Sequence, residues 1–215
     1  MEPCSTRKSA NKKEHGRMER KLAYLHTLRR TAITVVLLVL CLPLFAQYNI
    51  KKLMDEGRSS LDNGYYVVAM QIFQRVVGLR PDKNEAWYLS GVSKYHLDDY
   101  KGAESDCTRA IDLNPFFVDY FELRAMSRLR EEKYDSAVAD FTRAIEMNPD
   151  NKDYWYNRAY CYAQVNAYDI AKQQLEYILK RWPNFISAIN LRQTILSTER
   201  LYKRKKDDKI SSKSR

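Results

Sequence analysis

The chain has 215 residues, enough for one or two domains, and it carries a formal net charge of +10. It contains only six glycines and six prolines, which argues against a fold of many tight turns and against a glycine-rich phosphate loop. Hydrophobic residues make up 45% of the chain and sixteen residues are tyrosine, so there is enough apolar surface for a folded core.

The positive charge is concentrated at the two ends of the chain. Residues 1–30 and residues 200–215 each sum to +6, which leaves −2 for the part between them. Nucleic-acid binding usually needs a basic face on a folded element. We therefore do not expect the central part of the chain to bind nucleic acid.

The basic N-terminal segment leads into an apolar run over residues 31–45, followed by Ala46 and Gln47. A positive segment, an apolar stretch and a small residue at its end form the layout of a secretory signal peptide. We expect residues 1–46 to be the basic region and signal peptide, with cleavage after Ala46. The mature protein would then be exported across the inner membrane of a bacterium.

Two features of this segment leave alternatives open. Leu44 is larger than the third position before a cleavage site prefers, so residues 31–50 could remain as an uncleaved signal anchor. The protein would in that case be membrane-associated rather than free in the periplasm. The basic region is long for a signal peptide, so translation could start at Met18 instead of Met1.

Few residues remain for metal, thiol or catalytic chemistry once the signal is removed. The mature chain would keep only Cys107, Cys161 and His96 of these types. This set cannot form the four-ligand zinc sites, and no CxxC pair exists, so we expect no metal and no cofactor. His96 has no nucleophile at a convincing spacing and no nucleotide-binding motif occurs, so we expect no enzyme.

A repeat of 34 residues dominates the central part. Prolines recur at this interval, and with each proline at position 32 the repeats are 50–83, 84–117, 118–151 and 152–185. Two further columns hold one residue type and a third holds only small residues: position 17 has Tyr66, Tyr100, Tyr134 and Tyr168; position 20 has Ala69, Ala103, Ala137 and Ala171; position 8 has Gly57, Gly91, Ala125 and Ala159. Several columns agree in one frame without a gap, which excludes coincidence.

The columns predict two helices in each unit. The small residue at position 8 would meet the small residue at position 20, so the second helix packs closely on the first. Tyrosine at position 17 would lie in the turn and cover the junction, and proline at position 32 ends the unit. One helix pair cannot bury its apolar face alone, whereas stacked pairs form a continuous core.

These four units resemble tetratricopeptide repeats, over residues 50–185. The resemblance implies an all-α, right-handed α-solenoid of four helix-turn-helix units. We expect residues 186–202 to form a C-terminal capping helix, so that the repeat domain spans 47–202. Residues 203–215 are expected to be a disordered basic tail.

Charged residues at two positions suggest contacts between the units. Arg124 and Arg158 occupy position 7 of units three and four, and Asp106 and Asp140 occupy position 23 of the units before them. The second helix of one unit packs on the first helix of the next in a solenoid. We therefore predict structural ion pairs between Asp106 and Arg124 and between Asp140 and Arg158.

In tetratricopeptide proteins the first helices line a concave groove, and the resemblance implies a partner-binding groove here. By position it would present Arg58, Tyr88, His96, Glu122, Met126, Arg130, Tyr156 and Tyr160. Tyrosine and methionine suit an extended peptide or a partner helix, although each residue could equally belong to an ordinary solvated helix face. The Lys and Asn clamp that some members use for acidic C-termini is missing, because Met54 and Arg58 occupy its first two positions.

The sequence therefore predicts an exported, non-enzymatic protein-interaction module, a scaffold or adaptor that binds a protein or peptide. We expect it in the periplasm or on a membrane facing it. The alternative is a membrane-anchored protein whose basic tail binds anionic lipid, glycan or nucleic acid.

Overall fold

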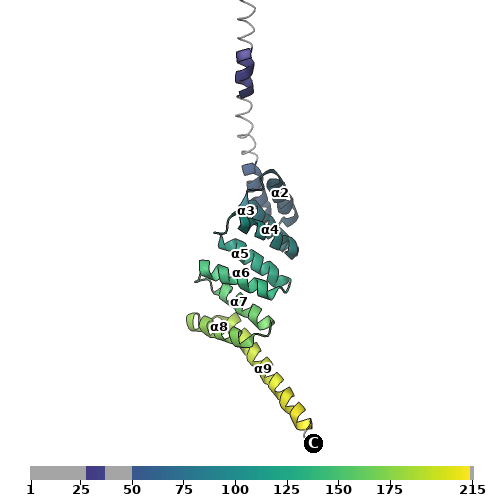
Figure 1. Ribbon diagram of the computed structural model, residues 1–215, viewed down its shortest axis with the longest axis vertical. Helices are drawn as coiled ribbons and strands as arrows, with labels where there is room; N and C mark the ends of the chain where they lie inside the picture. Colours follow the sequence, from purple (N-terminus) through teal and green to yellow (C-terminus); the bar gives the residue numbers. More distant parts are fainter. Residues whose placement is uncertain (1–27, 37–49, 214–215) are drawn as a thin grey trace, which may run out of the picture. The chain divides into compact units, whose positions relative to one another are not determined.

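A computed structural model describes residues 28–36 and 50–213 of the chain, with side chains for residues 28–36 and 50–205 (Figure 1). The described residues form helices and turns, and none of them is in a strand. The first helix of the repeat region covers residues 50–62, followed by α2 Tyr66–Leu79, α3 Asn84–His96, α4 Tyr100–Leu113, α5 Val118–Arg130, α6 Tyr134–Met147, α7 Lys152–Gln164, α8 Tyr168–Arg181 and α9 Ile186–Lys213.

Each repeat is a helix hairpin, and the hairpins stack in chain order, so the expected all-α solenoid fold is confirmed. The first helices α3, α5 and α7 begin at position 1 of their repeats, and the second helices α2, α4, α6 and α8 begin at position 17. Figure 1 shows α2 to α8 following one another along the stack. The two helices of units two, three and four pack against each other, and from α2 onward so do the neighbouring helices of successive units.

The turn inside each hairpin has the same backbone geometry in all four units. Position 15 has a positive φ in each case: 77° at Gly64, 59° at Asp98, 58° at Glu132 and 61° at Asn166. Glycine, asparagine and aspartate tolerate this left-handed conformation at low cost. The tyrosine at position 17 adds a contact in two units, because its hydroxyl donates to Asp98 in one and to Asn166 in the other.

The columns of small residues allow the two helices of a hairpin to lie close together. All four alanines at position 20 are fully buried, as are the side chains at position 24: Phe73, Cys107, Phe141 and Leu175. A Cβ added at Gly91 would lie 3.3 Å from the carbonyl oxygen of Ala103, so positions 8 and 20 face each other as expected. The core of each unit therefore lies between its own two helices.

Two further columns hold successive units together. The indole Nε1 of Trp87 donates to the carbonyl of Pro81 at 2.9 Å, and Trp155 donates to Pro149 at the same distance. These bonds tie position 4 of one unit to the proline that ends the previous unit. The tyrosine at position 17 covers the junction: Tyr66 stacks on His96 of the next unit with ring centroids 4.4 Å apart.

The charged pairs differ from the predicted ones. Asp106 lies 2.6 Å from Lys94 Nζ and accepts a hydrogen bond from Ser90, both in its own unit. Arg124 forms a two-pronged pair with Asp140, with contacts of 2.7 and 2.9 Å, instead of pairing with Asp106. The predicted pairs Asp106–Arg124 and Asp140–Arg158 are therefore wrong in their partners.

The antiparallel geometry of a hairpin explains the correction. Position 8 faces positions 20 and 24 of the same unit, so position 7 faces position 23 of that unit and not of the one before. Arg158 follows the same rule, since its Nε donates to Gln174 at 3.0 Å. The arginine at position 7 contacts the preceding unit at position 25 instead. Arg158 donates to Thr142 at 3.1 Å, and Arg124 donates to Thr108 at 3.3 Å.

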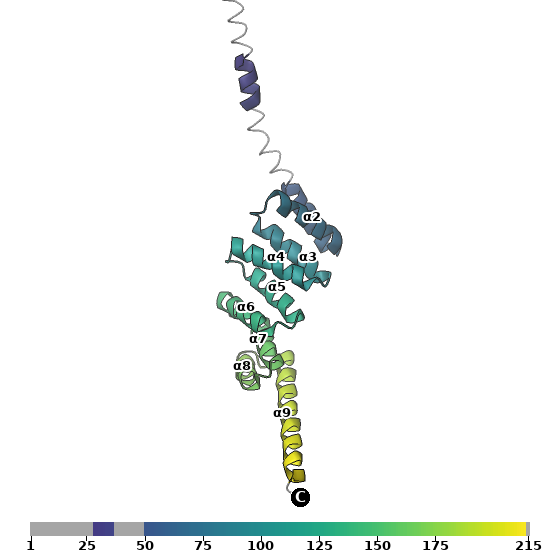
Figure 2. The same ribbon diagram turned by 45° about the vertical axis from the view of Figure 1, so that its right-hand side comes forward.

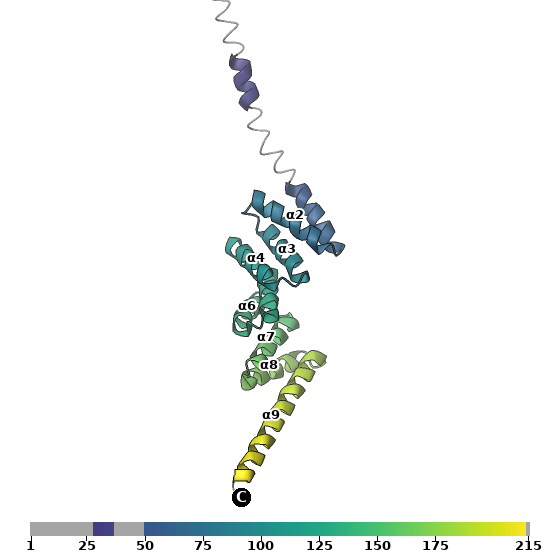
Figure 3. The ribbon, with the colours of Figure 1, turned by 90° about the vertical axis from the view of Figure 1, so that its right-hand side faces the viewer.

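Helix α9 begins as the expected cap but is longer than predicted. Ala188 and Ile195 are buried in one cluster with Leu175 and Ile178 of α8. The helix then continues to Lys213 and extends away from the repeats, as Figures 2 and 3 show, so the expected disordered tail is not found over 203–213. No glycine or proline occurs from residue 184 onward, so nothing in the sequence stops the helix where the other first helices end.

The N-terminal segment is described only in part. Residues 28–36 form a short helix, shown in purple in Figure 1. The expected cleavage site after Ala46 and residues 37–45 of the apolar run lie outside the described residues. Among the residues that are described, no helix combines the length and apolar character needed to cross a membrane.

Candidate partner-binding surface

The first helices form one connected side of the repeat stack, here called the first-helix face: residues 50–62, α3, α5 and α7. Side-chain contacts join each of these helices to the next. Arg58 Nη2 lies 2.6 Å from Glu85 Oε1. The hydroxyl of Tyr120 donates to Asn84 at 3.0 Å, and that of Tyr154 donates to Glu122 at 2.8 Å. Polar side chains thus bridge the whole row of first helices.

Most of the predicted binding residues lie along the middle of this face. The ring of Tyr88 packs on Tyr120 at 4.9 Å, and Asn157 Nδ2 lies 3.6 Å from the sulfur of Met126. Tyr156 lies between two other rings, 6.4 Å from Tyr160 and 5.5 Å from Phe185. Arg58 also lies on this face, where it pairs with Asp55 as well as with Glu85.

Two predicted residues, His96 and Arg130, lie instead at the turn ends of their helices. His96 stacks on Tyr66, as described above, and Tyr95 packs edge-on against it at 6.1 Å. Arg130 places its guanidinium 5.9 Å from the ring of Tyr100 and donates to Tyr95 at 3.4 Å. Both residues at position 13 therefore cover the junction with the preceding unit, and both side chains have a structural contact of their own.

A hollow of about 350 Å³ opens on the first-helix face between α3 and the start of α5. Its walls come from Asn84, Glu85, Tyr88, Leu89, Phe117, Asp119 and Tyr120. Only Tyr88 belongs to the predicted binding set. Phe117 reaches the hollow from the loop before α5 and is 47% exposed. The hollow thus combines aromatic rings, which supply apolar contact, with two carboxylates at its edge.

The sequence contains a signal for part of this hollow. Glu85, Asp119 and Asp153 all occupy position 2, which is one of the groove positions of the family. A column of acids in three successive units is therefore visible once the repeat frame is known. The contribution of Phe117 and Tyr120 is not visible in the same way, since it depends on how the loop and α5 pack against α3.

The electrostatics of the hollow are negative. Burial raises the pKa of Glu122, the hydrogen bond from Tyr154 lowers it, and the neighbouring Asp119 and Asp153 raise it further. Burial also raises the pKa of Tyr120 to about 12, with the charges of Glu85 and Asp119 acting in the same direction. Within the described residues, Asp119, Glu122 and Asp153 form no ion pair with a cation of this chain.

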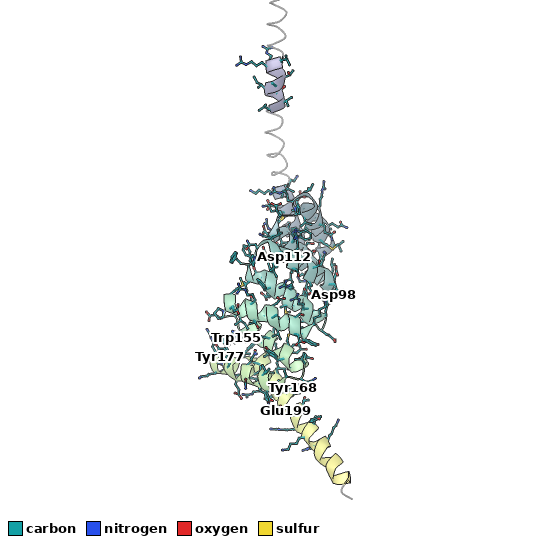
Figure 4. All side chains as sticks on the ribbon, viewed as in Figure 1. Asp98, Asp112, Trp155, Tyr168, Tyr177 and Glu199 are labelled. Atoms are coloured by element: carbon teal, nitrogen blue, oxygen red, sulfur yellow. The ribbon has the colours of Figure 1, made fainter. Side chains whose placement is uncertain are left out.

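Further side chains of the repeats lie between a first helix and a second helix. Figure 4 labels Trp155 and Tyr177, whose rings lie 4.6 Å apart where α8 meets α7. Cys107 and Cys161 are free and buried between helices, and burial raises the pKa of the Cys161 thiol to about 12. In the described part of the chain, no group of three histidine, cysteine or acidic residues could hold a metal ion.

The chain belongs to the tetratricopeptide repeat family. The family model, described as tetratricopeptide repeat, matches residues 54–116 and 123–184, which together make up more than half of the chain. No curated protein sequence shows significant similarity to the chain.

Several solved structures share the fold. MamA from Desulfovibrio magneticus RS-1 is 18% identical with a TM-score of 0.58, over 61% of this chain and 74% of MamA. YrrB, described as a repeat protein with an unusual peptide-binding site, is 21% identical with a TM-score of 0.60, over 64% of this chain and 71% of YrrB. The second repeat domain of human RPAP3, solved with an HSP70 peptide, is 22% identical with a TM-score of 0.52, over 54% and 97%.

Proposed function

We propose that the chain is an exported, non-enzymatic interaction module that binds a peptide or a partner helix on its first-helix face. The observation that carries this proposal is the contrast between the buried columns of the repeats and the residues of the first-helix face. The columns at positions 8 and 20 are buried and hold only glycine or alanine, whereas the first-helix face bears tyrosine, methionine, arginine and glutamate in varying order. A face whose residues differ from unit to unit can specialise for a partner.

The chemistry of the face fits a peptide. Tyr88, Tyr156 and Tyr160 offer rigid apolar area with a hydroxyl at the tip, and Met126 adapts its shape to an irregular partner. Two of the structures with this fold, YrrB and the RPAP3 domain, are described with a peptide-binding site or with a peptide. The missing Lys and Asn clamp argues that the partner of this chain is not an acidic C-terminus.

The export part of the proposal rests on the sequence. The basic N-terminal segment and the apolar run before Gln47 have the layout of a signal peptide. Cleavage after Ala46 would release the repeat domain into the periplasm, and retention of residues 31–50 would hold it on a membrane facing that compartment. Sequencing the N-terminus of the purified protein distinguishes the two.

Replacing two tyrosines of the face tests the binding site. Tyr88→Ala with Tyr156→Ala is expected to weaken a peptide selected from a random library on the full chain by about 1 kcal/mol or more per anchor. Ring area for the partner is lost while the buried alanines at position 20 stay intact, so the helicity should change little. Fluorescence anisotropy measures the affinity, and circular dichroism measures the fold.

The controls separate this site from the rest of the surface. Tyr177→Ala removes a 43% exposed tyrosine from the second helix α8 and should leave peptide affinity unchanged. Truncation after Tyr202 removes most of the basic end and should also leave it unchanged. Loss of binding on truncation, with no effect of the two tyrosine changes, would assign binding to the basic end and reject the groove.

A further inference from the structure

The hollow between α3 and α5 has the composition of a site for a positively charged side chain. Tyr88, Phe117 and Tyr120 form aromatic walls, and the tilted rings of Phe117 and Tyr120 lie 5.1 Å apart. Glu85 and Asp119 stand at its edge. Aromatic faces attract cations, and a carboxylate beside them adds a charge-assisted hydrogen bond.

The two carboxylates of the hollow differ in whether this chain already neutralises them. Glu85 pairs with Arg58 at 2.6 Å. Asp119 has no cationic partner among the described residues, and neither does the half-buried Glu122 one turn further along α5. Burial is the main cause of the raised pKa of Glu122, and repulsion from the charge of the neighbouring Asp119 raises it further. A cation at this place would relieve the repulsion.

Long basic side chains match the combination of aromatic walls and a carboxylate in the hollow. Arginine and lysine carry an apolar stem that packs on rings and a charged head that reaches a carboxylate. Arginine suits the hollow better, because its planar guanidinium stacks on aromatic rings and binds carboxylates through two nitrogens. An acidic or neutral partner residue would leave Asp119 unpaired.

We infer that the hollow between α3 and α5 takes an arginine or lysine side chain from a basic segment of a partner protein lying across the first-helix face. The inference rests on the proposed function and specifies the chemistry of its partner. The acid column continues at Asp153 on α7, so a segment with spaced basic residues could satisfy both units.

A selection experiment on the full chain tests the inference directly. Peptides selected from a random library are expected to be enriched in arginine and lysine and depleted in aspartate and glutamate. Exchanging the key arginine of a selected peptide for citrulline, its neutral isostere, should weaken binding about tenfold, or about 1.4 kcal/mol. Binding should also weaken as salt is added, since charges at a surface are screened.

Variants of the chain test whether Asp119 is the carboxylate that binds the basic side chain. Asp119→Asn is expected to cost about the same tenfold and to make the arginine and citrulline peptides bind alike. Asp112→Asn removes an exposed acid from α4, as labelled in Figure 4, and should leave both affinities unchanged. Both exchanges keep the size of the side chain, so neither is expected to disturb the fold.

The outcomes distinguish this inference from the proposed function on which it rests. Selected peptides that lack basic residues but still depend on Tyr88 would overturn the cationic partner and leave the groove intact. Peptides indifferent to Tyr88 and Tyr156, or a selection without binders, would reject the groove itself. Self-association that needs both Asp119 and the basic end of a second copy would assign the hollow to that copy and overturn a separate partner.

Discussion

Replacing Asp140 with alanine is expected to lower the free energy of unfolding by about 3–5 kcal/mol. Asp140 is 3% exposed and binds two guanidiniums: Arg124 through two contacts and Arg128 through Nη1 at 2.7 Å. Its removal leaves Arg124 without a counterion and Arg128 with Glu104 as its remaining carboxylate partner. Urea denaturation of the full chain measures the loss.

The expected loss of stability has a second source, because the carboxylate of Asp140 belongs to a network of ion pairs that spans two units. Arg128 also donates to Glu104 on α4 at 2.7 Å, and Lys133 contacts the other oxygen of that carboxylate at 2.7 Å. Burial alone would raise the pKa of Glu104, but the bonds from Lys133 and Arg128 outweigh burial and lower the pKa to about 2. The stabilisation from Glu104 is therefore present above its unfolded pKa and is lost only as pH falls toward 2.

A double-mutant cycle separates the observed pairing from the one that the sequence suggests. Asp140→Ala and Arg124→Ala should be non-additive by about 1–3 kcal/mol, because the two side chains share a direct contact. Asp106→Ala and Arg124→Ala should add to within about 0.5 kcal/mol. Coupling in the second cycle and none in the first would reject the contacts described here. Asp112→Ala, which removes an exposed acid, should cost less than about 0.5 kcal/mol.

Gly57→Ala is expected to destabilise the chain by about 1–2 kcal/mol, although alanine favours helices. A Cβ at this position would lie 2.6 and 2.7 Å from two ring atoms of the buried Phe73 and 3.2 Å from Ile72. Such overpacking costs about 1–3 kcal/mol, and the helix preference of alanine offsets only about 1 kcal/mol of it. Thermal and urea unfolding both measure the change.

Another glycine of the same repeat supplies the matched control. Nothing lies within 4 Å of a Cβ added at Gly78, which is exposed on α2, so Gly78→Ala should stabilise the chain by about 0.5–1 kcal/mol. Alanine at position 8 stands beside leucine in unit four, as Ala159 and Leu175, and beside phenylalanine in unit three, as Ala125 and Phe141. Because the ring of Phe73 is what the added Cβ would meet, Phe73→Leu should rescue Gly57→Ala, so that the double variant loses less than the sum of the single losses. Stabilisation by Gly57→Ala would contradict the close packing of this hairpin.

The helix hairpins could be predicted from the sequence because each of their determinants recurs at the same interval. Proline at position 32, alanine at position 20 and tyrosine at position 17 constrain the chain locally, so their spacing alone locates both helices. Even the turn follows, since Gly64 and Asn166 favour the left-handed backbone that position 15 adopts. Glu132 adopts it without such a preference, because the rest of its hairpin determines the turn.

Pairing between particular side chains was harder to predict. Position 7 lies close to its own second helix and to the preceding one, and only the packed helices show that Asp140 faces Arg124 while Thr108 lies on the other side. A run of basic residues suggests a disordered tail, whereas α9 continues through it to Lys213. Lysine and arginine are good helix formers, and no residue after Pro183 breaks the helix.

The candidate binding surface was predicted in outline. Tyr88 and Glu122 lie on the face that the family resemblance implies, whereas His96 and Arg130 contact the rings of neighbouring tyrosines at the unit junctions. The walls of the hollow were missed for a physical reason. Phe117 lies in a loop, and Tyr120 lines the hollow from α5, where its hydroxyl donates to Asn84 of the preceding unit.

The central claim is that the first-helix face is where this chain binds its partner, and mapping the contact tests it most directly. A peptide selected on the full chain, carrying a photoreactive group, can be crosslinked to the protein and the attached residues found by mass spectrometry. The account predicts crosslinks on α3, α5 and α7, near Tyr88, Met126 and Tyr160. Crosslinks on the second helices, or on α9 beyond Tyr202, would contradict it.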